Sequence, residues 1–291
     1  MSTLIENVAK VEAAHAALKD AIAAKGVTVP EGTKLTGMPA LVAQIQTTPE
    51  QTNVRACFAA DDLAGSLVVP KTMVVDMLTT TNLRYFFYNC RAMTSLVLPT
   101  GFGQNATTLY NCFFQCGSLT SLTLPDGFGQ AAADLANCFF QCGSLTSLTL
   151  PDGFGQAAAD LGSCFHDCVK LTSLTLPDGF GQNATTLYNC FYNCRAMTSL
   201  VLPTGFGQNA TNNTNCFHNC SALTDITGNP NFKASLNLST SPRMTHDSLM
   251  VVINGLQTVP TAQTLTLGTT NLAKLTDEER KVATDKGWTL A

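Results

Sequence analysis

The chain has 291 residues, of which 45% are hydrophobic and only 12% are charged, and its formal net charge is −4. Ordinary apolar content with so little charge excludes an intrinsically disordered chain, and the slight excess of acidic residues argues against a nucleic-acid-binding protein. No run approaches the roughly 18–20 apolar residues that cross a bilayer, and we therefore expect no membrane insertion.

The N-terminal segment, up to Lys25, is predicted to form a helix with a heptad seam. The seam positions alternate spacings of four and three, the other positions are mostly good helix formers, and Gly26 ends the helix. Two interpretations remain open: the seam packs against the chain's own repeats, or it forms a parallel coiled coil that joins chains into a dimer or trimer. The seam consists of Leu4, Val8, Val11, His15, Leu18 and Ile22.

Residues 1–50 are expected to be a separate segment for oligomerisation or attachment, ending in a short linker at 47–53. Glu6 and Glu12 stand where a signal peptide needs a basic start and an apolar run, and we expect no signal peptide. Residues 21–46 contain a Pro-Gly turn and a second short helix. They resemble a small module of tail-fibre and tail-associated proteins from gut bacteriophages.

An internal repeat with a 26-residue period governs the rest of the chain, and cysteines mark it. The segment RAMTSLVLPTGFGQNAT occurs at 91–107 and again at 195–211, four periods later, which indicates duplication within the gene. The period defines six regular units within residues 73–228. One cysteine series comprises Cys112, Cys138, Cys164, Cys190 and Cys216, and the other comprises Cys90, Cys116, Cys142, Cys168, Cys194 and Cys220.

Each unit combines three kinds of local pattern. LTSLTL at 119–124 is typical of a short strand, and the PDGFGQ that follows contains turn residues. The spacing of Leu135, Cys138 and Cys142 predicts one face of a short helix or 3₁₀ segment. One such unit cannot bury its apolar face alone, whereas stacked units share a continuous core. The sequence therefore predicts an α/β solenoid whose units each contribute a short strand and a short helix.

The run CFFQCGSLTSLTLP at 138–151 resembles the AFxxCxxLTSITIP signature of the BspA-like (Treponema-type) leucine-rich repeats. All six regular units carry it, although the family's Ala before Phe is mostly Cys here and the loop is longer. The resemblance implies a leucine-rich repeat fold. It also implies adhesion or recognition, because proteins of this family are typically surface adhesins.

The solenoid is expected to span 54–291, with an irregular opening cap at 54–72 and a closing cap at 229–291. In the closing cap, Thr276 is the predicted N-cap of the last helix, and Trp288 is expected to seal the final layer. Residues 264–290 resemble the ends of phage or prophage proteins. The cap should hold strands at 235–238, 264–267 and 288–290 and helices near 247–254 and 277–286.

No Ser/His/Asp arrangement, paired-carboxylate motif or P-loop is visible, and we expect no enzyme and no cofactor. The CxxxC spacing of the cysteines is not the CxxC of zinc ribbons, and we expect no metal site. A thiol is a small apolar group that fills narrow layers, which favours buried thiols over disulfides. The recurring GFG turns predict a core ladder of phenylalanines at Phe102, Phe128, Phe154, Phe180 and Phe206.

Two exposed columns are candidate ligand surfaces, because one repeat position becomes one stripe of a solenoid. On the strand face the column residues are Ser121, Thr123, Ser147, Thr149, Ser173 and Thr175. Beside the predicted helix they are Tyr88, Phe114, Phe140, His166, Tyr192 and His218. Exposed aromatic rings suit stacking on sugars or anchoring a protein partner. Alternatively, these rings pack on one another.

The sequence as a whole predicts a non-enzymatic protein that binds a protein or glycan on a cell surface. The terminal resemblances and the heptad seam favour a phage or prophage tail-associated recognition protein, located on the virion. One alternative is a bacterial cell-surface or extracellular adhesin, and a second is a structural spacer without a ligand.

Overall fold

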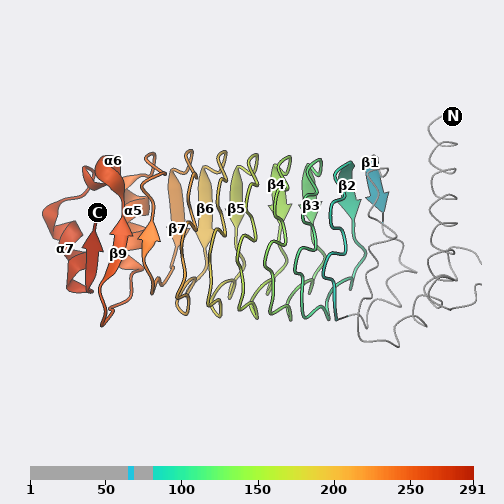
Figure 1. Ribbon diagram of the computed structural model, residues 1–291, viewed down its shortest axis with the longest axis horizontal. Coiled ribbons are helices and arrows are strands. Elements are labelled where there is room, and N and C mark those ends of the chain that lie inside the picture. The colour runs from blue at the N-terminus through green and yellow to red at the C-terminus, as the bar shows by residue number, and fades with distance from the viewer. Residues whose placement is uncertain (1–64, 69–80) are drawn as a thin grey trace, which may run out of the picture.

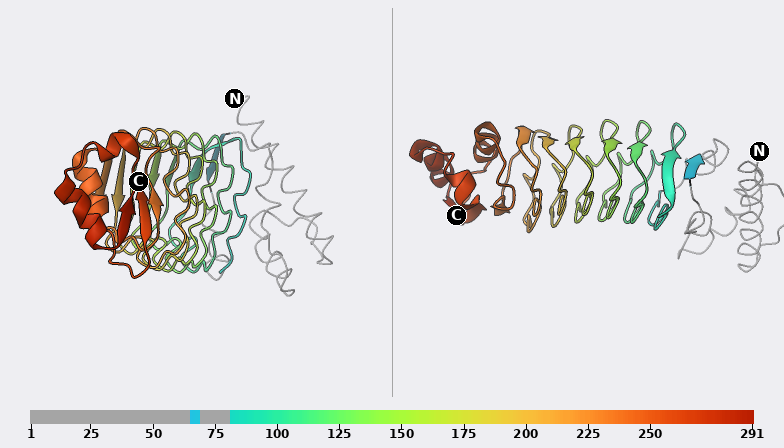
Figure 2. Two further views of the ribbon diagram at one scale, coloured as in Figure 1. Left: turned by 60° about the vertical axis from the view of Figure 1, so that its left-hand side comes forward. Right: turned by 90° about the horizontal axis from the view of Figure 1, so that it is seen from above.

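The computed structural model describes residues 65–68 and 81–291, and Figure 1 shows a row of short strands along the longest axis, with helices at the C-terminal end. Figure 2 shows successive coils of the chain stacked directly on one another, which confirms the predicted repeat solenoid. The predicted N-terminal helix, its six seam residues and the rest of segment 1–50 lie outside the described residues, as do Cys57 and most of the opening cap.

Each described unit contributes one short strand to the row. The apolar side chain at the centre of the strand is buried while its neighbours face outward, which is the alternation that LTSLTL predicts. The strands are β1 (Gly65–Val68), β2 (Met93–Val97), β3 (Ser121–Thr123), β4 (Ser147–Thr149), β5 (Ser173–Thr175), β6 (Ser199–Leu202) and β7 (Asp225–Gly228). Paired strands are parallel and in register, so that Leu122 faces Leu148 and Leu174 faces Leu200.

The core contains two columns of fully buried phenylalanines. In one column, rings one unit apart stack nearly parallel, with centroids 5.2 Å apart for Phe113 and Phe139. The other column is the GFG ladder predicted from the sequence, where the Phe128 and Phe154 centroids are 6.3 Å apart. Because every unit places the same ring at the same height, the core continues without interruption from one unit to the next.

The prediction of a short helix or 3₁₀ segment in each regular unit is wrong. Residues 134–142 form successive turns, and we call these residues and their equivalents in the other units the turn segment. Within it, Asn137 and Gln141 adopt left-handed backbone conformations with φ of 56° and 58°. A helix would direct every N–H to a carbonyl of its own unit. Here alternate N–H groups bond to the next unit instead, as from Phe139 to the Cys164 carbonyl at 2.8 Å. Consecutive turns also bury residues at spacings of three and four, which is why the pattern was ambiguous.

The second cysteine series is held by a specific hydrogen bond. Each of its described members from Cys116 onward donates its thiol to the carbonyl of a core phenylalanine 29 residues earlier, as Cys142 does to Phe113 at 3.2 Å. That carbonyl also accepts an N–H from its own unit, and the thiol uses its second lone pair. All eleven cysteines among residues 81–291 are buried thiols, as predicted.

The closing cap contains the predicted strands and both predicted helices. The helices are α5 (His246–Asn254) and α7 (Asp277–Asp285), and the strands are β8 (Leu236–Asn237), β9 (Gln263–Thr266) and β10 (Trp288–Leu290). Thr276 caps α7 in a reciprocal box with Glu279, and buried Trp288 donates its indole N–H to the Gln257 carbonyl. A further short helix, α6 (Gly268–Leu272), had no sequence prediction.

The GFG turns lead to a stability prediction. Gly155 has φ +68°, and a Cβ there would lie 2.7 Å from the Phe180 ring of the next unit. We expect Gly155→Ala to lower the free energy of unfolding by about 2 kcal/mol, because it adds a left-handed alanine and displaces a stacked ring. Denaturant unfolding followed by circular dichroism measures this difference.

Gly143→Ala is the matched control. A Cβ at Gly143 would meet its nearest neighbour, a Val169 methyl, at 3.7 Å, which is ordinary van der Waals contact. We expect this substitution to be neutral or slightly stabilising. Equal destabilisation by both substitutions would contradict the assigned role of Gly155.

Candidate binding surface

The strand face presents two parallel columns of hydroxyl groups. In β3, β4 and β5 the sequence is Ser-Leu-Thr, and both the serine and the threonine are exposed beside the buried leucine. The structure therefore places the six predicted Ser and Thr residues together on one face. Adjacent parallel strands lie about 4.8 Å apart, so the columns form a dense, uncharged array.

The threonine column gives way on both sides to valine, whereas the serine column continues. Val97 in β2 is 54% exposed and Val201 in β6 is 37% exposed, at the position that threonine occupies in the three central strands. The three central units therefore form a polar zone with an apolar border.

The strand face opens between β4 and β5. Strands β1 and β2 form one sheet, β3 and β4 a second, and β5, β6 and β7 a third. The β2–β3 junction is therefore also unpaired, but it keeps the bond from the Thr120 N–H to the Thr94 carbonyl, whose counterpart from Thr172 to Thr146 is not formed between β4 and β5 in the described part of the chain. The Leu124 N–H bonds to the Thr149 carbonyl at 3.1 Å, but among the described hydrogen bonds the equivalent one from Leu150 to Thr175 is not formed. On the turn segment the same two units remain joined, for example by the 2.8 Å bond from Phe139 to Cys164. The units thus separate on the strand side alone.

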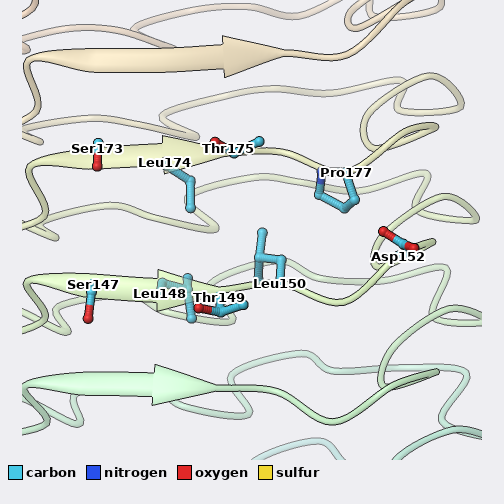
Figure 3. Close-up of a pocket in the computed structure, with 9 residues that line it drawn as sticks. All are labelled: Ser147, Leu148, Thr149, Leu150, Asp152, Ser173, Leu174, Thr175 and Pro177. Atoms are coloured by element: carbon cyan, nitrogen blue, oxygen red, sulfur yellow. The ribbon is translucent and has the colours of Figure 1, made fainter.

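This opening is a cleft of about 340 Å³. Its rim carries hydroxyl groups from both strands, and Figure 3 shows the Leu150 side chain reaching from the β4 ribbon toward β5. Leu150 is half-buried, whereas its counterparts Leu124 and Leu176 are each only 3% exposed. The lining comprises Ser147, Leu148, Thr149, Leu150, Asp152, Ser173, Leu174, Thr175 and Pro177.

The sequence analysis named the four hydroxyl residues of the cleft but missed its leucines, Asp152 and Pro177. The segment LTSLTLPDGFGQ is identical at 145–156 and 171–182, on the two sides of the opening. The sequences of the two strands and their following turns therefore do not distinguish the two sides of the opening.

The six predicted aromatic residues lie in one column, but they are half-buried and not freely exposed. Their rings stack on one another, with centroids 4.7 Å apart for Phe114 and Phe140 and 4.6 Å apart for His166 and Tyr192. This is the alternative in which the rings pack together. Because the faces of the inner rings are covered, any ligand contact there would involve ring edges, and a binding role for this column stays a prediction.

A ladder of polar side chains runs beside the aromatic column and was not predicted. Gln115 donates its amide to Gln141 at 2.7 Å, and both Gln141 and Asn193 donate to the carboxylate of Asp167. His166 Nδ1 lies 3.2 Å from Asp167 Oδ2. Burial lowers the pKa of the His166 imidazole, and the opposing effect of Asp167 is smaller. The recurrence of Asn, Gln or Asp at the same position of successive repeats was the available signal.

The buried thiols are poorly suited to nucleophilic or metal chemistry. Burial raises the pKa of ten of the eleven described cysteines, to about 12 for Cys142 and Cys220. Hydrogen bonding from Cys116 lowers the pKa of the eleventh, Cys90. Thiolates, which are the reactive and metal-binding form, are therefore disfavoured along most of both series.

Within residues 65–68 and 81–291, no cluster of three or more His, Cys, Asp or Glu side chains is arranged to hold a metal ion. No helix in that part of the chain is both long enough and apolar enough to span a bilayer.

The model of one protein family, described as the BspA type leucine-rich repeat region, matches six copies within residues 80–158 and 135–237 of this chain. Together these ranges cover just over half of the sequence. No curated protein matches the chain.

Three solved structures are similar. A leucine-rich repeat protein of T. pallidum is 19% identical, with a TM-score of 0.45, over 59% of this chain and 74% of that one. A leucine-rich cell surface protein of Faecalibacterium prausnitzii is 15% identical, with a TM-score of 0.29, over 58% of this chain and 60% of that one. A leucine-rich repeat protein of Bacteroides ovatus is 16% identical, with a TM-score of 0.33, over 72% of this chain and 62% of that one. The match spans less than two thirds of each of the latter two proteins.

The raised thiol pKa values predict loss of stability in alkali. In the unfolded chain thiols ionise near pH 8.5, whereas in the folded chain the same groups stay protonated, so the unfolded state loses protons first. Above that pH the free energy of unfolding should fall by about 1 kcal/mol per pH unit for each such thiol. Denaturant unfolding between pH 8 and 10 measures the slope.

The double variant Cys142→Ala with Cys220→Ala is the control. Its unfolding free energy should fall less steeply with pH, by about 2 kcal/mol per pH unit, because two of the buried thiols are missing. An unfolding free energy that is constant from pH 8 to 10 in the unsubstituted protein would contradict the burial of the thiols.

Proposed function

Because this chain belongs to the BspA-type leucine-rich repeat family, we propose that it is a non-enzymatic protein that binds a protein or glycan on a cell surface. The observation that carries this proposal is the strand face. It combines exposed hydroxyl columns, a border of exposed valines and a cleft between β4 and β5. A spacer without a ligand needs none of these features.

The strand face supports binding better than the aromatic column does. Side chains on the strand face point outward and leave their hydroxyl groups available, whereas the aromatic rings cover one another's faces. The polar ladder beside those rings satisfies its own hydrogen bonds from unit to unit. A new partner there would first have to displace contacts that stabilise the stack.

For the biological setting, we favour a phage or prophage tail. Residues 21–46 and 264–290 resemble segments of such proteins, and in this setting residues 1–50 would attach or oligomerise the chain. The alternative setting is a bacterial cell surface, which is typical of adhesins in this family. In both settings the solenoid presents the contact surface.

Retention on cells tests the proposed function. We expect the full chain to be retained on intact bacterial cells, and the double variant Thr123→Lys with Thr175→Lys to reduce retention at least tenfold by placing charge on the strand face. Ala157→Lys, at an exposed position in a turn, is the control and should bind normally. Flow cytometry of cells with labelled protein gives the measurement.

Other outcomes of the retention experiment would overturn the proposal or the setting. Retention on host matrix proteins in place of bacterial cells would favour the adhesin. Retention that is unaffected by the strand-face variant but lost in Tyr192→Ala would move the site to the aromatic column. Absence of retention on all of these surfaces would favour the structural spacer.

The oligomerisation role of residues 1–50 has a separate test. If the seam joins chains, the full chain should be a dimer or trimer by light scattering. Val11→Glu with Leu18→Glu should then convert it to monomer, because carboxylates cannot be buried between the helices without partners. A monomeric unsubstituted protein would leave the seam to pack on the chain's own repeats.

A further inference from the structure

We propose that the cleft between β4 and β5 binds a neutral sugar ring of a surface glycan. This inference rests on the proposed function and deepens it, because it names both the anchoring site and the chemical class of the ligand. Four features of the cleft carry it: its backbone groups, its hydroxyl rim, its apolar floor and its charge.

The cleft exposes backbone groups that join the strands at the β3–β4 and β5–β6 junctions. The Leu176 N–H bonds to the Val201 carbonyl at 3.2 Å, and the Leu124 N–H bonds to Thr149 in the same way. At the β4–β5 junction, the Leu150 N–H and the Thr175 carbonyl do not bond to each other. One donor and one acceptor thus line the same opening, and a sugar hydroxyl can accept from the first or donate to the second.

The rim supplies four hydroxyl groups, two from each strand. A hydroxyl group donates one hydrogen bond and accepts two, and its hydrogen rotates to suit the partner. This versatility matches a ligand whose own polar groups are hydroxyls on several sides of a ring. Figure 3 shows the two Ser-Leu-Thr triplets side by side on the neighbouring strands.

The floor of the cleft is apolar. Leu148 is 9% exposed, compared with 2% for Leu122 on the neighbouring strand, and half-buried Leu150 and Pro177 extend the apolar surface. A pyranose ring has one face made of C–H groups and an edge made of hydroxyls. Such a ring lying on the leucines would keep its hydroxyls at the rim.

The charge of the lining selects against anionic ligands. Asp152 is the only ionisable residue that lines the cleft, and no lysine or arginine faces it. The lining also lacks the Trp, Tyr and Arg side chains that dominate protein–protein hot spots. Both absences favour a neutral sugar over a phosphate-bearing ligand or a protein partner.

The size of the cleft suits a small portion of a glycan. About 340 Å³ lies at the lower end of the range for small-molecule sites. We therefore expect weak binding of one or two rings, with a dissociation constant of about a millimolar, and stronger attachment to a cell through many copies of the glycan.

Saturation-transfer NMR with the full chain tests the ligand class. The probes are three neutral tetrasaccharides whose rings all carry vicinal diols: maltotetraose, cellotetraose and β-1,4-mannotetraose. We expect at least one of them to receive saturation from the protein, and Thr175→Lys to reduce that signal at least tenfold.

Ala157→Lys is the matched control, because it places the same charge at an exposed turn position that does not line the cleft. It should leave the signal within twofold of that of the unsubstituted protein. Circular dichroism checks that both variants fold, and Ser147→Lys, on the opposite rim, provides a second cleft variant. Equal effects of the substitutions at Thr175 and Ala157 would overturn the proposed cleft site.

Cells treated with periodate, which cleaves vicinal diols of sugars, separate this inference from the proposed function. We expect treatment to abolish retention of the chain. Retention that survives treatment, or that occurs while none of the three tetrasaccharides gives a signal, would overturn the glycan inference and leave the binding function standing. Absence of both retention and signal would overturn both.

Discussion

The structure depends on one interaction, the hydrogen bonds that alternate residues of the turn segment donate to the next unit. From Leu135 to Gln141, every second N–H reaches a carbonyl of the following unit, at 2.8 to 3.0 Å. These bonds hold equivalent residues at the same height in successive units. The stacked phenylalanines, the thiol bonds and the side-chain ladders follow from that alignment, because each joins residues about one repeat apart.

Alignment of identical residues explains the unusual composition. A column of like charges spaced about 4.8 Å apart would repel at every step. Amides and hydroxyls both donate and accept, and the same residue can therefore bond to its own copy, as Gln115 does to Gln141, or to the backbone of its copy, as Thr146 does to Thr120. The low fraction of charged residues is thus a consequence of stacking, and the buried cysteines satisfy the same requirement inside the core.

The sequence could predict the features that recur in every repeat, but it could not predict the features that depend on how neighbouring units contact one another. The repeat period, the buried strand leucines, the phenylalanine ladder and the Thr276 cap all have local signatures. Turns were mistaken for helices because both bury residues at spacings of three and four, and only the destination of alternate N–H groups separates them. For the aromatic column the sequence left exposure and mutual stacking as alternatives, because a single unit does not show how copies of a ring meet.

The cleft shows how a repetitive solenoid can present a distinct site. Strands β2 and β3 are also unpaired, but they keep the bond from Thr120 to Thr94, whereas among the described hydrogen bonds β4 and β5 lack both strand-side bonds. The two triplets of the cleft are identical in sequence, so the difference lies in how two units meet. Leaving two strand-side bonds unmade, from Leu150 to Thr175 and from Thr172 to Thr146, costs about 1–3 kcal/mol. The turn-side bonds between the same units remain, and the stacked phenylalanines beneath stay in register. Because solenoid stability is a sum over neighbouring units, a local loss of that size is tolerated, and it converts a uniform face into one with a defined anchoring point.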